Sequence, residues 1–442
     1  MKTVIVVSYN FPPVGGAGVQ RPVKFVKYIS KYGWKPVVVT VANPSVPVID
    51  KSLENDIPIG VRIYKASTLE PSYEQKQGFT TTNNNATGRL KKYFKIIISR
   101  LLLPDLQVLW WPGLVWTLIF AIRKEHPACL FVTAPPFSSF IPVIVVGRLF
   151  GVPVVLDYRD EWTFSRNAWE NASRGRLVTF IDTALELFVC SQCAAFTAAN
   201  ASYVASLNLS YPKSAIGKGH VITNGFDEED FEVRIRPPLS VKANDKITFI
   251  YTGTVWAATS FKSLLAAFEK LLLKQPGLSE NITLKIIGRV VDSEALCFEN
   301  NAVSKIVELC GYIEHDRIFE EMYYSDVLLL TLSDLPGAEK IICGKAFEYM
   351  ASGKHIFAVV PDGETKNVIC ANYDNATIAN PSDVHSVLLG IMSIIENISL
   401  IRAKRGNDVS QFSRRKLTED LVKVFNMVAI KNDSDVNINA EQ

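Results

Sequence analysis

Short runs of β-branched and other apolar residues alternate with helical stretches along the first half of the chain. The predicted strands are residues 4–7, 36–41, 129–132, 153–157, 195–198 and 220–223. Strands that alternate with helices are typical of parallel sheets joined by right-handed crossovers. The first half is therefore predicted to be an α/β domain.

A second series of the same kind follows a change in composition. The acidic residues 228–230 and the paired prolines 237–238 indicate a linker. Beyond it we expect strands at 246–252, 282–287, 306–310, 327–331 and 355–360, with helices at 260–274 and 345–352. The chain is thus expected to form two Rossmann-like, doubly wound domains, residues 1–230 and 231–411.

The end of the chain shows a helical pattern. Apolar residues recur with the helical period between residues 412 and 430, and the opposite face is polar. We expect a helix at 412–431 that packs back toward the N-terminal domain. Residues 432–442 carry few apolar side chains and are expected to form a disordered tail.

Composition narrows the class of protein. The 47 basic and 44 acidic residues give a net charge of +3, too balanced for a dedicated nucleic-acid-binding protein. The seven cysteines are an odd number scattered over a long chain, which favours a reducing compartment. The apolar run at residues 4–7 is too short for a signal-peptide core. These features predict a cytoplasmic location.

One stretch, residues 106–122, is apolar enough to be considered as a transmembrane segment. It contains Gln107 and Pro112 and falls short of about 20 apolar residues, so a buried or interfacial helix is expected. Just before it, basic residues alternate with apolar ones between Arg89 and Arg100. This pattern suits an anionic membrane surface, and an ordinary solvated helix face is the alternative.

Three glycines follow the first predicted strand. Gly15, Gly16 and Gly18 lie between that strand and a predicted helix, where backbone N–H groups can approach an anion. Their spacing differs from the G-x-G-x-x-G pattern, which disfavours a dinucleotide site. A tight turn is the alternative.

A lysine and a glutamate lie together at the start of a helix in the second half. The Glu348 carboxylate can accept hydrogen bonds from ribose hydroxyls, and Lys345 can neutralise a diphosphate. An ordinary pair on a helix surface is the alternative.

Other reactive residues give weaker signals. Asp157 and Asp160 flank Arg159 after a strand, which fits either an internal ion pair or a site. Cys190 and Cys193 have redox spacing but follow an apolar helical run, which favours buried cysteines. The five histidines show no metal-ligand spacing, so no metal site is predicted.

Six motifs in order along the chain resemble one protein family. They lie at residues 11–22, 133–138, 156–162, 222–227, 251–254 and 345–354. In this order they resemble the retaining glycosyltransferases of family four, and in particular a bacterial subgroup that builds surface polysaccharides. The resemblance implies the GT-B fold, in which two Rossmann-like domains face each other across a cleft.

The resemblance also implies a set of site residues. Glu348 corresponds to the second glutamate of the family's E-x7-E motif, which binds the nucleotide ribose. Lys345 and Arg289 would face the diphosphate. Asp160, named from its position beside Arg159, is the third candidate catalytic residue. The implied donor-binding residues are Gly15, Gly16, Gly18, Asn224, Thr254, Lys340 and Glu348.

The sequence departs from the family pattern at three positions. Lys340 stands where the first glutamate of the motif is expected, with Glu339 one residue away. Thr254 follows Gly253 where relatives carry an arginine, and Phe140 stands where a histidine is expected.

The implied function is retaining transfer of a hexose-like sugar from a nucleoside-diphosphate sugar. The acceptor would be a glycan or a polyprenyl-linked molecule, and the enzyme would need neither a cofactor nor a metal. It would work in the cytoplasm, at the inner face of the membrane. An epimerase or phosphorylase of the same fold and a non-catalytic sugar-binding scaffold are the alternatives.

Overall fold

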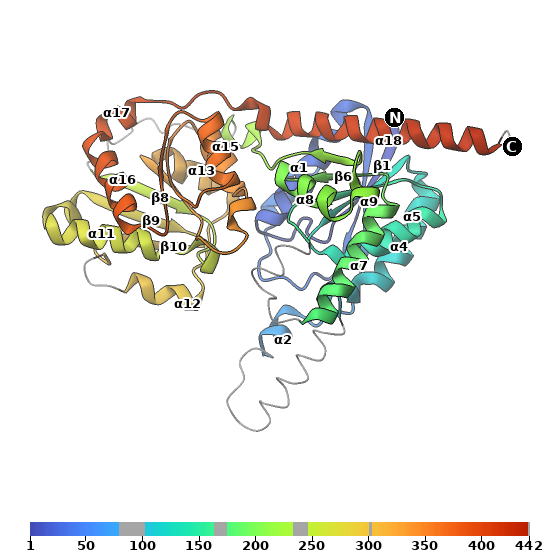
Figure 1. Cartoon of the computed structure of the whole chain (residues 1–442), viewed down its shortest axis with the longest axis horizontal. Helices are drawn as coiled ribbons and strands as arrows, with labels where there is room; N and C mark the ends of the chain where they lie inside the picture. Colours follow the sequence, from blue (N-terminus) through green and yellow to red (C-terminus); the bar gives the residue numbers. More distant parts are fainter. Residues whose placement is uncertain (79–101, 163–174, 233–245, 300–302, 441–442) are drawn as a thin grey trace, which may run out of the picture. The chain divides into compact units, whose positions relative to one another are not determined.

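The computed structural model describes residues 1–78, 102–162, 175–232, 246–299 and 303–440, and it divides into two compact units (Figure 1). The first unit is Met1–Thr223 with Arg414–Gln442, and the second is Asn224–Ser413. The division falls at Thr223, a few residues before the position expected from the sequence. The basic segment between Arg89 and Arg100 lies outside the described residues.

A parallel sheet of seven strands forms the centre of the first unit, in the order β3-β2-β1-β4-β5-β6-β7. The strands are β1 Lys2–Val7, β2 Trp34–Val41, β3 Arg62–Ala66, β4 Cys129–Ala134, β5 Val154–Tyr158, β6 Ala195–Ala198 and β7 Gly219–Val221. The predicted strands are confirmed at the middle of this sheet. The edge strand β3 was not predicted, because its residues are only partly buried and lack a clear apolar run.

Helices cover both faces of this sheet because its strands are apolar on both sides. In β1, Val4 and Val6 face the core shared with α1 (Ala17–Ile29) and α18 (Arg414–Ala440). Ile5 and Val7 face the opposite core, which α4, α5 and α7 cover. These three helices are Trp111–Glu125, Phe140–Leu149 and Arg176–Gln192. The shorter helices α8 and α9 are Ala201–Ser210 and Pro212–Ala215.

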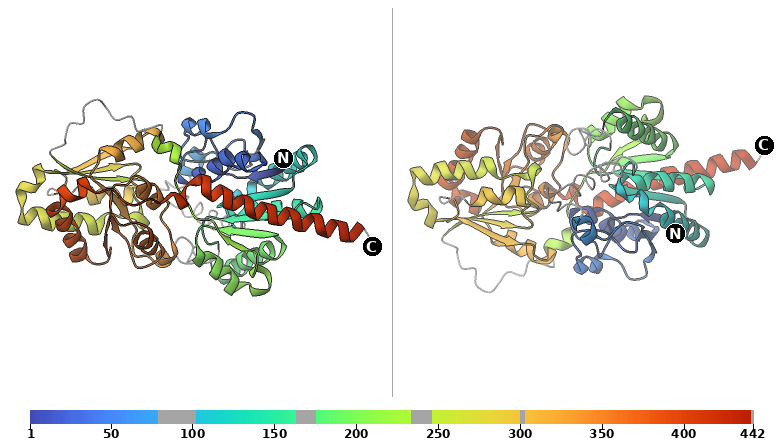
Figure 2. Two further views of the ribbon diagram at one scale, coloured as in Figure 1. Left: turned by 90° about the horizontal axis from the view of Figure 1, so that it is seen from above. Right: turned by 90° about the horizontal axis from the view of Figure 1, so that it is seen from below.

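The C-terminal helix α18 belongs to the first unit and lies along α1 (Figure 2). Leu417, Leu421 and Phe425 are buried in the core that α1 and β4 also line. The Trp34 indole donates to Asn426 Oδ1 at 3.0 Å. The helix extends to Ala440 and so includes most of the segment that was expected to be a tail.

Residues Leu106–Glu125 form a helical stretch that is long and apolar enough to cross a membrane by length and composition. Within it, the side chains of Leu114, Leu118 and Ile122 are buried against the sheet. The sequence expectation of a buried or interfacial helix agrees with this packing.

The second unit is built on a parallel sheet of six strands, in the order β10-β9-β8-β11-β12-β13. The strands are β8 Ile247–Thr252, β9 Ile282–Ile287, β10 Val307–Gly311, β11 Val327–Thr331, β12 His355–Val359 and β13 Ala376–Ala379. The main helices are α10 Glu228–Glu232, α11 Lys262–Lys274, α13 His315–Tyr324, α14 Gly344–Ala351, α15 Glu364–Asn372 and α16 Val384–Glu396. The prediction of two doubly wound α/β units is confirmed. Strand β13, at the sheet edge, was not predicted.

Candidate functional site

The strand order of the second unit reverses between β8 and β11. In open parallel sheets, ligands bind beyond the carboxyl ends of the strands at such a switch point. Three segments leave the sheet at this edge: the loop after β8, the loop after β9, and the segment that joins β11 to α14. They carry most of the donor-binding and catalytic residues that the sequence predicted for the second half.

The loops after β8 and β9 run side by side through two glycines. Gly288 has a φ of +130°, and a Cβ there would lie 2.1 Å from the carbonyl oxygen of Gly253. Only glycine allows this approach. The Val255 N–H then donates to the Arg289 carbonyl at 2.8 Å. The backbone pairing fixes where Thr254 and Arg289 leave the sheet.

Both predicted residues on these loops, Thr254 and Arg289, are exposed. The Arg289 guanidinium makes no hydrogen bond or ion pair with any residue that the structure describes. Its charge is therefore available to an anionic ligand at the carboxyl edge of the sheet.

Helix α14 begins at the same edge with an open N-terminus. Its first residue, Gly344, is exposed, and no side chain caps the helix at Cys343. The helix has no acidic residue in its first turn. Among the described residues, the backbone N–H groups of Gly344 and Lys345 have no hydrogen-bond partner. Unpaired N–H groups and the helix dipole favour an anion at this position.

Lys345 and Glu348 lie on the same side of α14. Lys345 Nζ is 2.8 Å from Glu348 Oε2, and the two side chains are 27% and 15% exposed. The structure therefore brings together the two residues predicted to contact diphosphate and ribose. In this structure they also form the helix pair that was the alternative interpretation.

A buried tyrosine holds α14 against the sheet. The Tyr349 hydroxyl accepts the backbone N–H of Thr252, the last residue of β8, at 3.0 Å, and lies 3.1 Å from Thr252 Oγ1. Burial raises the pKa of Tyr349, so the hydroxyl stays protonated. Sequence reasoning did not identify this contact, which positions the helix.

Lys340 and Glu339 lie on a short 3-10 helix between β11 and α14. The Glu339 carboxylate accepts the Gly337 N–H at 3.0 Å, so it stabilises its own turn. The backbone of Glu339 packs on Gly363, where a Cβ would lie 2.3 Å from the Glu339 carbonyl oxygen. Lys340 is partly exposed.

The predicted glycine loop of the first unit is held by an arginine. Pro22 lies inside α1 and has no N–H, so the carbonyl of Gly18 lacks its helical donor. The Arg159 guanidinium donates to this carbonyl and to that of Pro135. Its Nε–H also donates to the carbonyl oxygen of Ala134 at 3.1 Å. Arg159 therefore links the glycine loop to the loop after β4.

The two other predicted glycines of this loop also have specific conformations. Gly16 precedes α1 with a φ of +98°, which favours glycine. The Gly15 N–H donates to the Val48 carbonyl at 2.9 Å. The backbone of Gly15 is thus held against residues beyond β2, and the prediction that this loop contacts donor phosphates stays a prediction.

The partner of Asp157 differs from the one suggested by its sequence neighbours. Asp157 is fully buried and pairs with Arg21 at 2.7 Å, not with Arg159. Thr133 and Thr197 also donate to it, at 2.7 and 2.6 Å. Desolvation opposes ionisation, but these contacts lower the pKa of Asp157. This is a structural pair of the core.

Asp160 and Asn224 are the remaining predicted residues. Asp160 is exposed and lies two residues after β5. Burial lowers the pKa of the neighbouring Arg159 guanidinium, and the Asp160 carboxylate opposes this effect. Asn224 is partly exposed in the loop between β7 and α10.

Phe140 stands where the family resemblance implies a histidine, but its position is not accessible. It is fully buried and packs against Tyr158, with ring centroids 5.0 Å apart, and against Trp162. A side chain at position 140 faces the core of the first unit. Phe140 therefore fills the core and does not offer a polar group in place of the histidine.

Buried cysteines and buried carboxylates also occur among the described residues. Burial raises the pKa of the Cys193 thiol to about 12, and no disulfide links Cys190 and Cys193.

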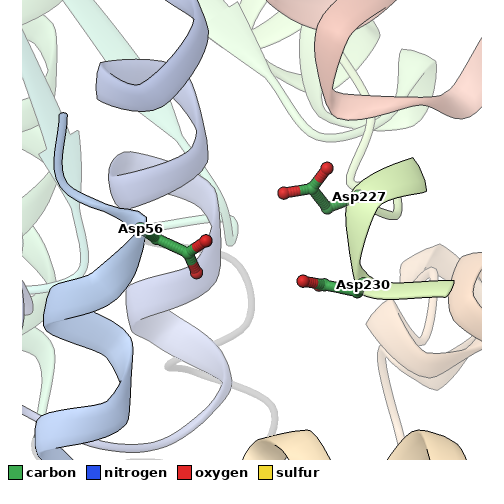
Figure 3. Close-up of side chains that lie close together, drawn as sticks. All are labelled: Asp56, Asp227 and Asp230. Atoms are coloured by element: carbon green, nitrogen blue, oxygen red, sulfur yellow. The ribbon is translucent and has the colours of Figure 1, made fainter. Parts of the chain in front are cut away.

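Two buried carboxylates of the second unit, Asp227 and Asp230, lie at the start of α10 (Figure 3). Asp56 of the first unit, drawn in the same figure, pairs with Lys24 at 2.8 Å. Sequence reasoning did not single out these three aspartates.

The second unit also contains an open pocket of about 410 Å³ at the C-terminal end of α14. It is lined by Met350, Ala351, Gly353 and residues 406–410, among others. Lys345 lies at the other end of this helix, which is roughly 10 Å away along the axis at 1.5 Å per residue. The pocket therefore does not include the candidate anion-binding residues.

Comparisons with known proteins give similarities of structure. No protein-family model and no curated protein matches this sequence. Among solved structures, sucrose-phosphate synthase from Thermosynechococcus elongatus superposes with a TM-score of 0.62, at 13% identity and with all of both chains covered. HepE from Anabaena in complex with UDP gives a TM-score of 0.60 at 13% identity, over 97% of this chain and 100% of HepE.

A third similar structure is named as an epimerase. The UDP-GlcNAc 2-epimerase from Neisseria meningitidis, bound to UDP-GlcNAc, gives a TM-score of 0.55 at 13% identity, over 97% of this chain and 100% of the epimerase. At such identities the comparisons establish the fold alone. Together with the two parallel sheets, they show that this chain has the GT-B fold of two Rossmann-like domains.

Proposed function

We propose that the chain is a retaining glycosyltransferase that takes a sugar from a nucleoside-diphosphate sugar. The observation that carries this proposal is the start of α14, where Lys345, Glu348 and unpaired N–H groups lie together at the switch point of the second sheet. Nucleotide sugars offer the matching groups: ribose hydroxyls for a carboxylate and a diphosphate for cations. The HepE and epimerase structures contain UDP or UDP-GlcNAc, so this fold holds such ligands in those proteins.

The chemical step breaks the bond between the anomeric carbon and a diphosphate oxygen, which leaves with the electron pair. The acceptor hydroxyl forms the new bond on the same face and passes its proton to the departing oxygen. Charge therefore grows on the diphosphate toward the transition state. Lys345, Arg289 and the N–H groups of α14 would stabilise that charge, as fixed donors do in other enzymes.

The remaining predicted residues take the other parts of the proposal. Gly15, Gly16 and Gly18 would approach the donor phosphates, while Asn224, Thr254 and Lys340 would contact the donor. Asp160 is the candidate group beside the acceptor, which is a glycan or a lipid-linked molecule in surface polysaccharide assembly. The proposed location is cytoplasmic, at the inner face of the membrane, and no metal or cofactor takes part.

An epimerase is the second candidate, because the superposition with UDP-GlcNAc 2-epimerase covers 97% of this chain. Incubation with a panel of nucleotide sugars, first without acceptor, distinguishes the possibilities. A transferase releases nucleoside diphosphate and free sugar slowly, whereas an epimerase interconverts two nucleotide sugars. A chain that binds nucleotide sugars but does neither, even with lipid and glycan acceptors added, would be a scaffold and would contradict the proposal.

A further inference from the structure

Helices α4, α5 and α7 form one layer on the first sheet (Figure 1). Their inner sides are buried: Leu118 of α4, Ile144 of α5 and Val189 of α7 all lie in the core. The outer side of this layer is the feature that the proposed transfer reaction does not explain.

The outer side carries large apolar side chains on all three helices. Trp116 is 79% exposed, Leu149 is 73% exposed and Phe180 is 70% exposed. We call this surface the apolar helix face; its residues are Trp116, Phe120, Val145, Leu149, Leu177, Phe180 and Leu187. Single exposed apolar residues are common, but a set spread over three adjacent helices marks an interaction surface.

The exposed charges on these helices all have one sign. Within α4, α5 and α7, which the structure describes completely, the exposed charged residues are Arg123, Lys124, Arg148 and Arg176. The carboxylates of the same helices, Glu125, Asp182 and Glu186, are buried. On an ordinary surface helix, acidic and basic residues both face water. On these three helices only the basic residues do.

Specific contacts hold two of these carboxylates inside. Glu125 accepts hydrogen bonds from Arg62 and Tyr64, both at 2.7 Å. Glu186 accepts a hydrogen bond from the Tyr211 hydroxyl at 3.0 Å. The outer surface is therefore apolar and cationic because its acidic groups are used within the fold.

Basic and aromatic groups also lie next to one another at the end of this layer. Lys124 Nζ is 5.6 Å from the centroid of the Phe120 ring, and the Arg123 guanidinium is 5.5 Å from that of Phe150. A hollow of about 350 Å³, lined by Arg123, His126 and Phe150 among others, lies at the C-terminal ends of α4 and α5. Aromatic rings beside basic groups suit the boundary between acyl chains and phosphate headgroups.

We propose that the apolar helix face docks the protein on the surface of a bilayer that contains anionic lipids. This inference rests on the proposed membrane location and names the surface responsible for it. The charges favour a lipid surface over a second copy of this chain, because an isologous contact would place the basic residues of both copies together. Helix α4 lies on the membrane and does not cross it, because Leu114 and Leu118 fill the core of the sheet.

Co-sedimentation with vesicles tests the docking surface. The full chain should bind vesicles of phosphatidylcholine and phosphatidylglycerol and should not bind vesicles of phosphatidylcholine alone. A variant with Trp116→Ala, Phe120→Ala and Phe180→Ala should bind at least about tenfold more weakly, because it loses apolar contact area. Leu273→Ala with Leu400→Ala is the matched control, since both residues are exposed on the second unit, and it should bind as the unchanged chain does.

A charge variant tests the cationic part of the surface. Substitution to glutamine of the four exposed basic residues should reduce vesicle binding by about fivefold per residue at low salt, and the difference should shrink as salt is added. These residues are Arg123, Lys124, Arg148 and Arg176. Quenching of tryptophan fluorescence by brominated lipids gives the position directly. Trp116→Phe should remove most of the quenching while vesicle binding is kept.

Three results would overturn the docking surface. The first is no binding to anionic vesicles at all. The second is unchanged binding by the variants of the apolar helix face together with lost binding when Lys91, Lys92 and Lys95 become glutamine. The third is that the apolar helix face binds an acidic protein and does not bind the vesicles. Release of nucleoside diphosphate from a soluble donor, measured on the same variants, separates this failure from a failure of the proposed transfer reaction.

Discussion

Lys345 Nζ and Glu348 Oε2 lie 2.8 Å apart on the first turns of α14. Each is the nearest counter-charge of the other, so a ligand that binds both must compete with their contact. A partly exposed pair of this kind contributes about 0–1 kcal/mol, so a diphosphate and a ribose can replace it at small cost. The i,i+3 spacing places both side chains on one face of the helix, and a ligand can separate their contact there.

Replacement of Lys345 by alanine should lower turnover more than donor affinity. The charge on the leaving diphosphate grows toward the transition state, so the lysine stabilises the transition state more than the bound donor. Steady-state kinetics with the donor found by screening should show kcat reduced by roughly 100-fold, as for loss of one fixed donor in other enzymes, with a smaller change in KM.

Lys366→Ala is the matched control, because Lys366 of α15 forms an exposed pair with Asp362, just before that helix, and should leave kinetics unchanged. If kcat stays constant in Lys345→Ala while KM rises, the lysine only docks the donor, and its assignment to the chemical step is wrong.

Tyr349→Phe should destabilise the second unit and weaken nucleotide binding together. The change leaves the backbone N–H of Thr252 without its acceptor in a buried position, which costs about 1–3 kcal/mol. Urea unfolding measures the free energy, and titration with nucleotide measures the affinity. Tyr324→Phe, at a partly exposed position on α13, is the control. Unchanged stability in Tyr349→Phe would show that this hydrogen bond does not position α14.

Because of Glu125, the free energy of unfolding of the first unit should fall at acidic pH. Burial alone would raise its pKa, but hydrogen bonds from Arg62, Tyr64 and Lys35 lower the pKa of Glu125 to about 2. A lowered pKa gives stability that is present above the ordinary value of 4.5 and is lost as the pH falls toward 2. Because Arg62 and Lys35 are half-exposed, the effect should be on the order of 2 kcal/mol.

Glu125→Gln should therefore be less stable at neutral pH and lose part of the pH dependence between about 4.5 and 2. Denaturant unfolding at a series of pH values measures this, with the exposed Glu280→Gln as control. Parallel pH profiles for Glu125→Gln and the unchanged chain would contradict the assigned contacts.

The sequence predicted the central strands because their apolar runs are buried on both sides, as in β2, where seven of eight residues are buried. It missed β3 and β13, two of the four edge strands, because their residues are mixed and only partly buried and show no clear apolar run. Periodicity reports burial, and burial decreases toward the edges of a sheet.

Contacts between distant residues explain what the sequence could not predict at the candidate sites. Asp157 had two plausible roles beside Arg159, but its partner Arg21 is 136 positions away. The bond from Arg159 to the Gly18 carbonyl depends on Pro22, whose effect is visible only once α1 is placed. Phe140 stands where a histidine was expected, and its burial in the core is visible only once α5 is packed on the sheet. Lys345 and Glu348 were found because helix spacing alone brings them together.

The contact between Glu348 and the nucleotide ribose is the most direct test of the proposed donor site. Calorimetric titration should use whichever of UDP, GDP or ADP binds best, together with its 2′,3′-dideoxy form, on the unchanged chain, Glu348→Ala and the exposed control Glu280→Ala. The unchanged chain and the control should bind the dideoxy form more weakly by about 1.5–3 kcal/mol, the value of hydrogen bonds to a charged group. Glu348→Ala should bind both forms equally and weakly; if it still prefers the ribose form by the full amount, Glu348 does not hold the ribose.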